Sequence, residues 1–261
     1  AVDARTGTIK WKYRPKAPDY GVRVAALMKG VVVADGKVFF VLRDNRLQAL
    51  DQHTGQLVWE TKLTDHPRAT TTAAPTYHDG LVYIGSAGGD GGARGQIGAY
   101  EAKTGKEVWK FYATPARGER GAETWEGDSY RFGGGTVWTI PAIDPDLGMI
   151  YFGTGNAAPN YDGAHRGGDN LFTASIVALD LKTGAYKWHF QEVHHDIWDY
   201  DAASAPLLAD VTYRAQPRKI LMHAGKTGFL YLLDRTNGQP LIGIEERPVP
   251  QAVQRRRFHA L

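Results

Sequence analysis

Cysteine is absent from this sequence of 261 residues, which excludes disulfide bonds, thiolate metal sites, thiol nucleophiles and covalently attached haem from this segment. Long apolar runs are missing too, because no stretch approaches the roughly 18 residues that a transmembrane helix needs. There is also little excess of one charge sign, because the sequence has 31 Lys and Arg and 28 Asp and Glu. The one basic cluster, residues 255–257, has no supporting face of charge, so no nucleic-acid partner is predicted.

A repeat of the form Ala-x-(Asp/Glu)-x-x-Thr-Gly-x-x-x-Trp occurs four times in the sequence. Its closing tryptophans are Trp11, Trp59, Trp109 and Trp188. A fifth, weaker copy at residues 232–238 keeps its Asp and Gly but has no Trp. The spacings between the acidic residues are 48, 50, 79 and 54, and the long interval contains an insertion at roughly residues 119–135. Such a period predicts stacked structural units.

Each repeat has the chemistry of a tight turn between two strands. The acidic side chain can accept backbone N–H groups across the turn, and the Gly supplies the positive φ that such a turn needs. Strand-forming runs such as residues 37–41 and 81–84 precede these turns, each after an Asp-Gly turn of its own. A lone four-stranded sheet cannot bury a tryptophan, so each Trp must dock on a neighbouring unit.

The predicted fold is therefore all-β, a β-propeller of about four to five blades within residues 1–250. Residues 251–261 have no strand pattern and are expected to form an irregular tail. The sequence starts inside a repeat, without the charged lead and apolar core of a signal peptide. We therefore expect the chain to be part of a longer protein.

The repeat resembles the tryptophan-docking motif of the quinoprotein alcohol dehydrogenases, which are eight-bladed propellers that carry pyrroloquinoline quinone (PQQ). The resemblance implies PQQ- and metal-dependent oxidation of an alcohol or a sugar by hydride transfer to the quinone. It also implies an external electron acceptor, such as a cytochrome or a quinone, and a periplasmic location. Non-catalytic propeller scaffolds for protein assembly share the repeat, so that function stays open, as does an inactive remnant of the enzyme.

Two segments between the repeats resemble metal-binding segments of this family. The glycine-rich residues 85–95 contain Asp90, where the family usually has Glu, and residues 153–157 contain Asn156. Both are implied metal ligands, and their hard oxygen donors suit calcium or a lanthanide ion. The alternative for each residue is an ordinary place in a turn.

The most specific segment, residues 194–201, contains Trp-Asp-Tyr-Asp and resembles the family's active-site stretch. The resemblance makes Asp199 the general base and a metal ligand, and Asp201 the extra acidic ligand found in lanthanide-dependent relatives. If the segment is extended, both carboxylates point to the same side. A zinc site on His194 and His195 is disfavoured because no third ligand appears at a familiar spacing.

The quinone contacts are also implied by resemblance. Trp138 would be the flat floor on which the quinone stacks, and Lys226 would lie beside the reactive quinone oxygens and stabilise developing negative charge. A core tryptophan and a surface lysine are the alternatives. Further implied cofactor contacts are Lys29, Thr72, Gly88 and Gly89. The family's two adjacent cysteines that cover the quinone have no counterpart here.

Overall fold

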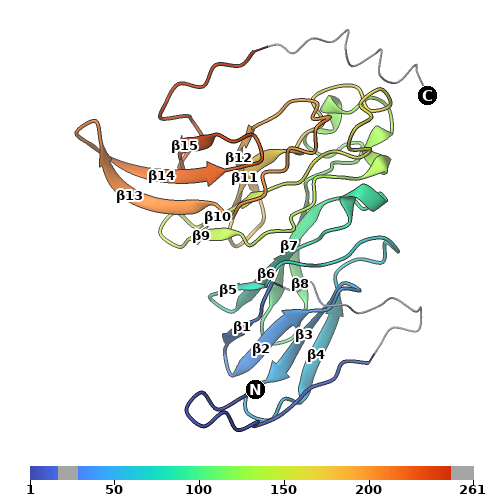
Figure 1. Ribbon diagram of the computed structural model, residues 1–261, viewed down its shortest axis with the longest axis vertical. Coiled ribbons are helices and arrows are strands. Elements are labelled where there is room, and N and C mark those ends of the chain that lie inside the picture. Colours follow the sequence, from blue (N-terminus) through green and yellow to red (C-terminus); the bar gives the residue numbers. More distant parts are fainter. Residues whose placement is uncertain (17–28, 248–261) are drawn as a thin grey trace.

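The computed structural model describes residues 1–16 and 29–247, so the tail expected at residues 251–261 lies outside the described residues. In the described part, the strands form three four-stranded sheets and one three-stranded sheet, all antiparallel. The sheets follow one another in chain order and form an arc, with the first at the bottom of Figure 1 and the last at the top. The predicted all-β propeller fold is confirmed.

Each sheet is built from consecutive strands. The first contains β1 (Val32–Ala34), β2 (Lys37–Val41), β3 (Arg46–Asp51) and β4 (Leu57–Lys62), and the second contains β5 (Thr76–His78), β6 (Leu81–Gly85), β7 (Gln96–Glu101) and β8 (Glu107–Tyr112). The third contains β9 (Ala142–Asp144), β10 (Met149–Gly153), β11 (Ser175–Asp180) and β12 (Tyr186–Gln191), and the fourth contains β13 (Leu207–Tyr213), β14 (Gln216–Ala224) and β15 (Leu230–Asp234). Three 3-10 turns complete the described elements: η1 (Gly89–Gly91), η2 (Ala122–Thr124) and η3 (Ser129–Phe132).

The turn that follows the third strand of each sheet is closed by the repeat's acidic side chain. Asp51 shows the pattern: its Oδ1 accepts the backbone N–H of His53 at 2.9 Å, and the N–H and hydroxyl of Thr54 at 2.7 and 2.9 Å. Gly55 then takes φ +73°, a left-handed conformation that favours glycine. We call the five segments of this kind, residues 3–7, 51–55, 101–105, 180–184 and 234–238, the docking turns.

Each repeat tryptophan docks on the docking turn of the next unit, as the sequence predicts. The indole N–H groups donate at 3.0–3.2 Å to backbone carbonyls of the following turn, in the pairs Trp11–Gln52, Trp59–Ala102, Trp109–Leu181 and Trp188–Arg235. A Cβ on the glycine of the receiving turn would lie only 2.5–2.6 Å from the indole, at Gly55, Gly105, Gly184 and Gly238. Glycine is thus required here both by backbone conformation and by the close approach of the ring.

The core lies between the sheets, because each inner sheet is covered on both faces. In β6, Val82 and Ile84 pack toward the first sheet, while Tyr83 packs toward the third. In β10, Ile150 packs toward the second sheet, while Tyr151 packs toward the fourth. Successive side chains of a strand point to opposite faces, so a strand buried on both faces reads as a continuous apolar run.

The insertion predicted between the third and fourth repeats forms the long connection from β8 to β9, which contains η2 and η3. The first repeat contributes one isolated bridge, between Val2 and Ile9. Among the described residues, no helix has the length and apolar character needed to cross a membrane.

Candidate active site

The candidate residues lie in loops that leave the sheets at the same end. Asp90 follows β6, Asn156 follows β10 and Lys226 follows β14, while Asp199 and Asp201 lie in the connection from β12 to β13. In antiparallel sheets of this order, the end of the second strand and the end of the fourth strand face the same way. The fold therefore carries loops from three different sheets toward one region.

Glycines let two of these loops pack backbone against backbone. Gly88 has φ +91° and lies against the carbonyl of Arg68, while a Cβ on Gly89 would be 2.9 Å from the Cα of Gly134. Gly134 in turn forms a bridge with Ala157. The predicted cofactor residues Gly88 and Gly89 therefore place the Asp90 turn beside the segment that contains Asn156.

Asn156 connects two of the three aspartates. Its side-chain Nδ2 donates to Asp90 Oδ1 at 3.2 Å, and its backbone N–H donates to Asp201 Oδ1 at 2.7 Å. Asn156 is 7% exposed and Asp201 is 5% exposed, while Asp90 lies at the surface. A Cβ on Gly155 would be 2.8 Å from Asp201 Oδ1 and 3.0 Å from Thr136 Oγ1, so glycine is needed for this packing.

Lys226 lies between Asp199 and Asp201. Its ammonium nitrogen is 3.0 Å from Asp199 Oδ2 and 2.5 Å from Asp201 Oδ2. Asp199 has φ +66°, so the segment is not extended as the sequence argument supposed, and the two aspartates meet through the shared lysine. We call Asp90, Asn156, Asp199, Asp201 and Lys226 the carboxylate cluster.

The electrostatics of the cluster follow from burial. Burial raises the pKa of Asp201, although Lys226 and the backbone N–H of Asn156 act in the opposite direction. Burial alone would lower the pKa of Lys226, but its hydrogen bonds to Asp201 and Asp199 outweigh burial and raise it. The lysine therefore stays an ammonium ion next to two carboxylates.

The loop that carries Asp199 is held by residues that sequence reasoning did not select. The carboxylate of Asp196 accepts the backbone N–H groups of Trp198 at 2.9 Å and of Tyr200 at 2.8 Å, on either side of Asp199. Arg166, which is fully buried, donates to the Asp196 carbonyl and to Asn170 Oδ1. Burial lowers the pKa of Arg166 to about 10 and raises that of Asp196.

A second buried pair, also not anticipated, lies behind Lys226. His223 Nδ1 is 2.5 Å from Glu192 Oε1, and both side chains are completely buried. His223 Nε2 is 3.1 Å from the carbonyl oxygen of Ser204, which can only accept, so this nitrogen carries a proton. No short sequence motif connects Glu192 and His223.

Trp138 forms a separate contact group with the two remaining predicted cofactor residues. The Lys29 ammonium is 4.2 Å from the centroid of the Trp138 ring and donates to its carbonyl oxygen at 3.0 Å. The Thr72 hydroxyl donates to the same carbonyl oxygen at 3.4 Å. Burial lowers the pKa of Lys29. Trp138 follows Thr136 by two residues in the sequence, and Thr136 and Asp201 both lie against Gly155.

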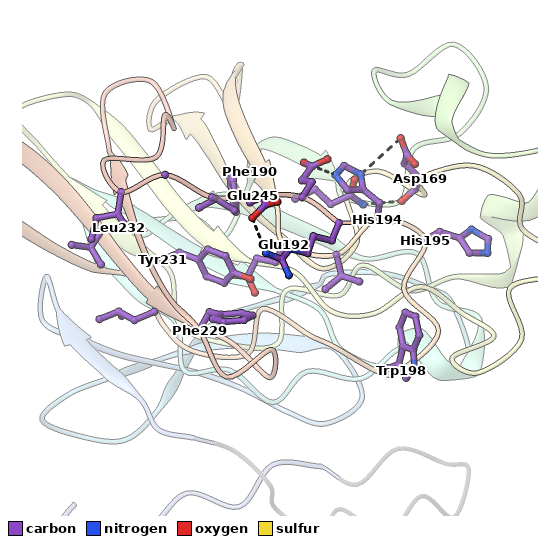
Figure 2. A pocket seen from close by; sticks show the side chains of 18 residues that line it. Asp169, Phe190, Glu192, His194, His195, Trp198, Phe229, Tyr231, Leu232 and Glu245 are labelled. Carbon is purple, nitrogen blue, oxygen red and sulfur yellow. Dashed lines mark hydrogen bonds and ion pairs between the residues drawn. The ribbon is translucent and has the colours of Figure 1, made fainter. Parts of the chain in front are cut away.

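The two histidines considered for zinc have separate partners. His194 lies near Asp169 and Glu246, at 3.8 and 3.3 Å, while His195 Nδ1 is 2.8 Å from the carbonyl oxygen of Gly168. Figure 2 shows the two imidazole rings apart from each other. Within residues 1–16 and 29–247, no three His, Cys, Asp or Glu side chains are grouped so as to hold a metal ion.

A groove of about 960 Å³ lies beside β12 and β15, and Figure 2 shows it from close by. Trp198, the neighbour of Asp199, lines one part of it, and Phe229, which is 68% exposed, lines another. None of the residues predicted for the site lines this groove. The groove and the carboxylate cluster are therefore distinct features of the same loops.

The fold and the site together define a class: a propeller of tryptophan-docked blades with an oxygen-rich, lysine-bridged cluster at one end of its sheets. Comparison with known proteins then places the chain within a family. Residues 1–257 match the PQQ family model described as "Glucose/ethanol/alcohol dehydrogenase, beta-propeller domain". The chain belongs to this PQQ dehydrogenase β-propeller family.

Individual relatives agree with this assignment. The chain is 42% identical to quinohemoprotein alcohol dehydrogenase ADH-IIG of Pseudomonas putida over 92% of its own length and 36% of the relative's. It is 34% identical to the lanthanide-dependent methanol dehydrogenase of Methylacidiphilum fumariolicum, covering 88% of the chain and 41% of the relative. The crystal structure of quinohemoprotein alcohol dehydrogenase from Comamonas testosteroni superposes with a TM-score of 0.84 at 38% identity, covering 95% of this chain and 40% of that one. The chain thus spans about two fifths of the length of these relatives.

Proposed function

We propose that this chain carries the cofactor site of a PQQ- and metal-dependent dehydrogenase that oxidises an alcohol or a sugar. The observation that carries the proposal is the carboxylate cluster, which joins loops from three sheets through contacts of 2.5–3.2 Å. A merely structural turn has no reason to bury Asp201 beside a second carboxylate. The names of the relatives, alcohol and methanol dehydrogenases, support the same chemistry.

The residues of the cluster fit a hard cation. Carboxylate and amide oxygens are the preferred ligands of calcium and similar ions, and the Lys226 ammonium between Asp199 and Asp201 supports a place for positive charge there. Asp90, Asn156, Asp199 and Asp201 would hold the metal; in the described residues the three carboxylates are not grouped as ligands, so their side chains would have to turn toward the ion. Because a trivalent ion favours more negative charge, the additional carboxylate of Asp201 supports a lanthanide as well as calcium.

When bound, the quinone supplies the carbon that accepts hydride, and the metal supplies Lewis acidity. The protein's part is proton transfer and positioning. Asp199 takes the hydroxyl proton of the substrate on its carboxylate, as general base. Lys226 places a positive charge where negative charge develops on oxygen.

Trp138 is proposed as the surface on which the flat cofactor stacks, since an indole suits a planar ring system. Lys29, whose ammonium lies over this ring, would pair with an anionic group of the cofactor, and Thr72 would provide a hydroxyl at its edge. Gly88 and Gly89 keep the adjoining loop close to the site. Transfer of electrons to a cytochrome or a quinone, and a periplasmic location, belong to the same proposal.

The test is reconstitution of the protein with PQQ and either CaCl2 or LaCl3, followed by dye-linked oxidation of a panel of alcohols and sugars. Asp199→Ala should lower the rate about 10²- to 10⁴-fold, the usual contribution of a general base, while equilibrium dialysis still detects the quinone. Asp146→Ala, which changes an exposed turn aspartate between β9 and β10, is the control and should keep the full rate. An unchanged rate for Asp199→Ala removes its role as base. A lack of quinone binding by the unaltered protein would favour a non-catalytic scaffold.

A further inference from the structure

The position of Lys226 has a consequence for metal loading, and this inference rests on the proposed function. Asp201 has two carboxylate oxygens, and both are engaged. Oδ1 accepts the backbone N–H of Asn156 at 2.7 Å, and Oδ2 is 2.5 Å from the Lys226 ammonium. Since the Asn156 bond is part of the backbone packing, Oδ2 is the oxygen that can turn to a metal. That oxygen is the one paired with lysine.

Asp199 presents the same arrangement. Its Oδ2 is 3.0 Å from Lys226, while its Oδ1 has a long contact of 3.5 Å with the side-chain amide of Asn160. One ammonium group thus pairs with an oxygen from two of the three proposed acidic ligands, Asp199 and Asp201. A metal ion and the ammonium would compete for the same two oxygens, because both need them within direct contact.

Lys226 is able to leave without disturbing the fold. Its side chain is 38% exposed, whereas that of Asp201 is only 6% exposed. The lysine has a flexible four-carbon stem, and its backbone N–H is separately held by the Asp201 carbonyl at 3.4 Å. The ammonium can therefore swing toward solvent while the backbone and the buried carboxylate stay in place.

We propose that Lys226 is a resident cation: it neutralises Asp199 and Asp201 until the metal arrives, and the metal must displace its ammonium to bind. The lysine keeps the buried Asp201 and the partly exposed Asp199 from repelling each other before loading, at the expense of metal affinity. After displacement it is released to face the substrate side of the site.

The experiment is calorimetric titration of LaCl3 and of CaCl2 into the quinone-free protein and its variants at fixed ionic strength. Lys226→Met should bind each metal roughly tenfold more tightly or better, because no ammonium has to be displaced. Lys187→Met is the matched control. Lys187 also pairs with an aspartate, Asp180, at 3.2 Å and is 39% exposed, but it lies at a docking turn. Its removal should leave metal affinity unchanged.

Thermal unfolding gives a second readout. Metal-free Lys226→Met should melt below the unaltered protein, because the buried Asp201 loses its counter-ion. Addition of LaCl3 should raise its melting temperature more than that of the unaltered protein, since stabilisation by a ligand grows with affinity. Lys226→Arg keeps the positive charge and should not bind metal more tightly than the unaltered protein. It is the second variant to measure if Lys226→Met does not fold.

The possible outcomes test two proposals separately: that the metal displaces Lys226, and that the metal binds at this site at all. If the unaltered protein and Lys226→Met bind metal equally well, displacement is wrong while the metal site stands. Weaker binding by Lys226→Met also overturns displacement and makes the lysine a supporting group. If none of the proteins binds either metal, the metal site of the proposed function is itself wrong, and displacement is wrong with it.

Discussion

Asp180 in a docking turn and Asp201 in the carboxylate cluster both accept backbone hydrogen bonds, yet their pKa values move in opposite directions. At Asp180 the effect of burial is outweighed by the N–H and hydroxyl of Thr183 and by Lys187, and the pKa is lowered. At Asp201 burial prevails over Lys226 and Asn156, and the pKa is raised. The charged form of Asp180 stabilises the folded state, whereas burial makes the charged form of Asp201 unfavourable in the folded state.

The docking tryptophans are buried or half-buried, whereas the tryptophan of the site loop is exposed. Replacing one of each kind by alanine should give the largest difference in the free energy of unfolding. Trp109 is 7% exposed and hydrogen-bonded to the next docking turn, whereas Trp198 in the site loop is 42% exposed. Trp109→Ala should lower the free energy of unfolding by about 3–5 kcal/mol. Trp198→Ala should lower it by at most about 1 kcal/mol. Urea unfolding with both variants checks this, and similar losses would mean that docking is not what stabilises the sheets.

A smaller difference in the free energy of unfolding separates the two reasons for glycine in a docking turn: its positive φ and the close approach of the indole. Gly184 has φ +69° and lies under the Trp109 ring, while Gly36 has φ +70° and a Cβ added to it would meet nothing within 4 Å. Gly36→Ala should cost about 1–2 kcal/mol through backbone strain alone. Gly184→Ala should cost about 1–3 kcal/mol more because the methyl group displaces the indole. Equal losses in chemical denaturation would show that the close approach to tryptophan carries no energy.

The smallest effect tests the opposite pKa directions directly. A carboxyl whose folded pKa is lowered, as at Asp180, contributes stability above its unfolded value of 3.8, and this is lost as pH falls. One whose folded pKa is raised, as at Asp201, contributes below 3.8 and loses this contribution as pH rises. Asp180→Asn should therefore be less stable than the unaltered protein at pH 7, by about 1 kcal/mol, and approach it in acid.

Asp201→Asn, without metal, should show the reverse sign: as stable as the unaltered protein or more so at pH 7, with the difference vanishing in acid. Unfolding free energies at a series of pH values between 3 and 7 give both curves. If the two variants follow the same curve, the contrast between turn and cluster is wrong.

The repeat was enough to predict the turns, the tryptophan docking and the all-β fold, because each depends on residues close together in sequence and on a period that recurs. It did not predict that the described fourth sheet has three strands, from β13 to β15. The candidate residues came from resemblance, and the structure brings Asp90, Asn156, Asp199, Asp201 and Lys226 together.

The residues that hold the cluster in place were not predictable. Arg166 donates to the carbonyl of Asp196, 30 residues further along the sequence, and Glu192 contacts His223, 31 residues further along. Such contacts join segments from different loops and leave no period in the sequence, because only the folded chain brings them close. A buried arginine or glutamate in a loop looks, in the sequence, like an ordinary solvated charge.

In the described part of the chain, each sheet packs on the sheets before and after it, so the fold is a short linear stack in which stability depends on contacts between neighbouring sheets. Asp90, Asn156 and Lys226 leave three successive sheets, so the cluster is complete only when the second, third and fourth sheets have all joined the stack. Loss of the last sheet alone would remove Lys226 and leave the earlier blades standing. The site is thus shared among three sheets, and no one of them holds all of its residues.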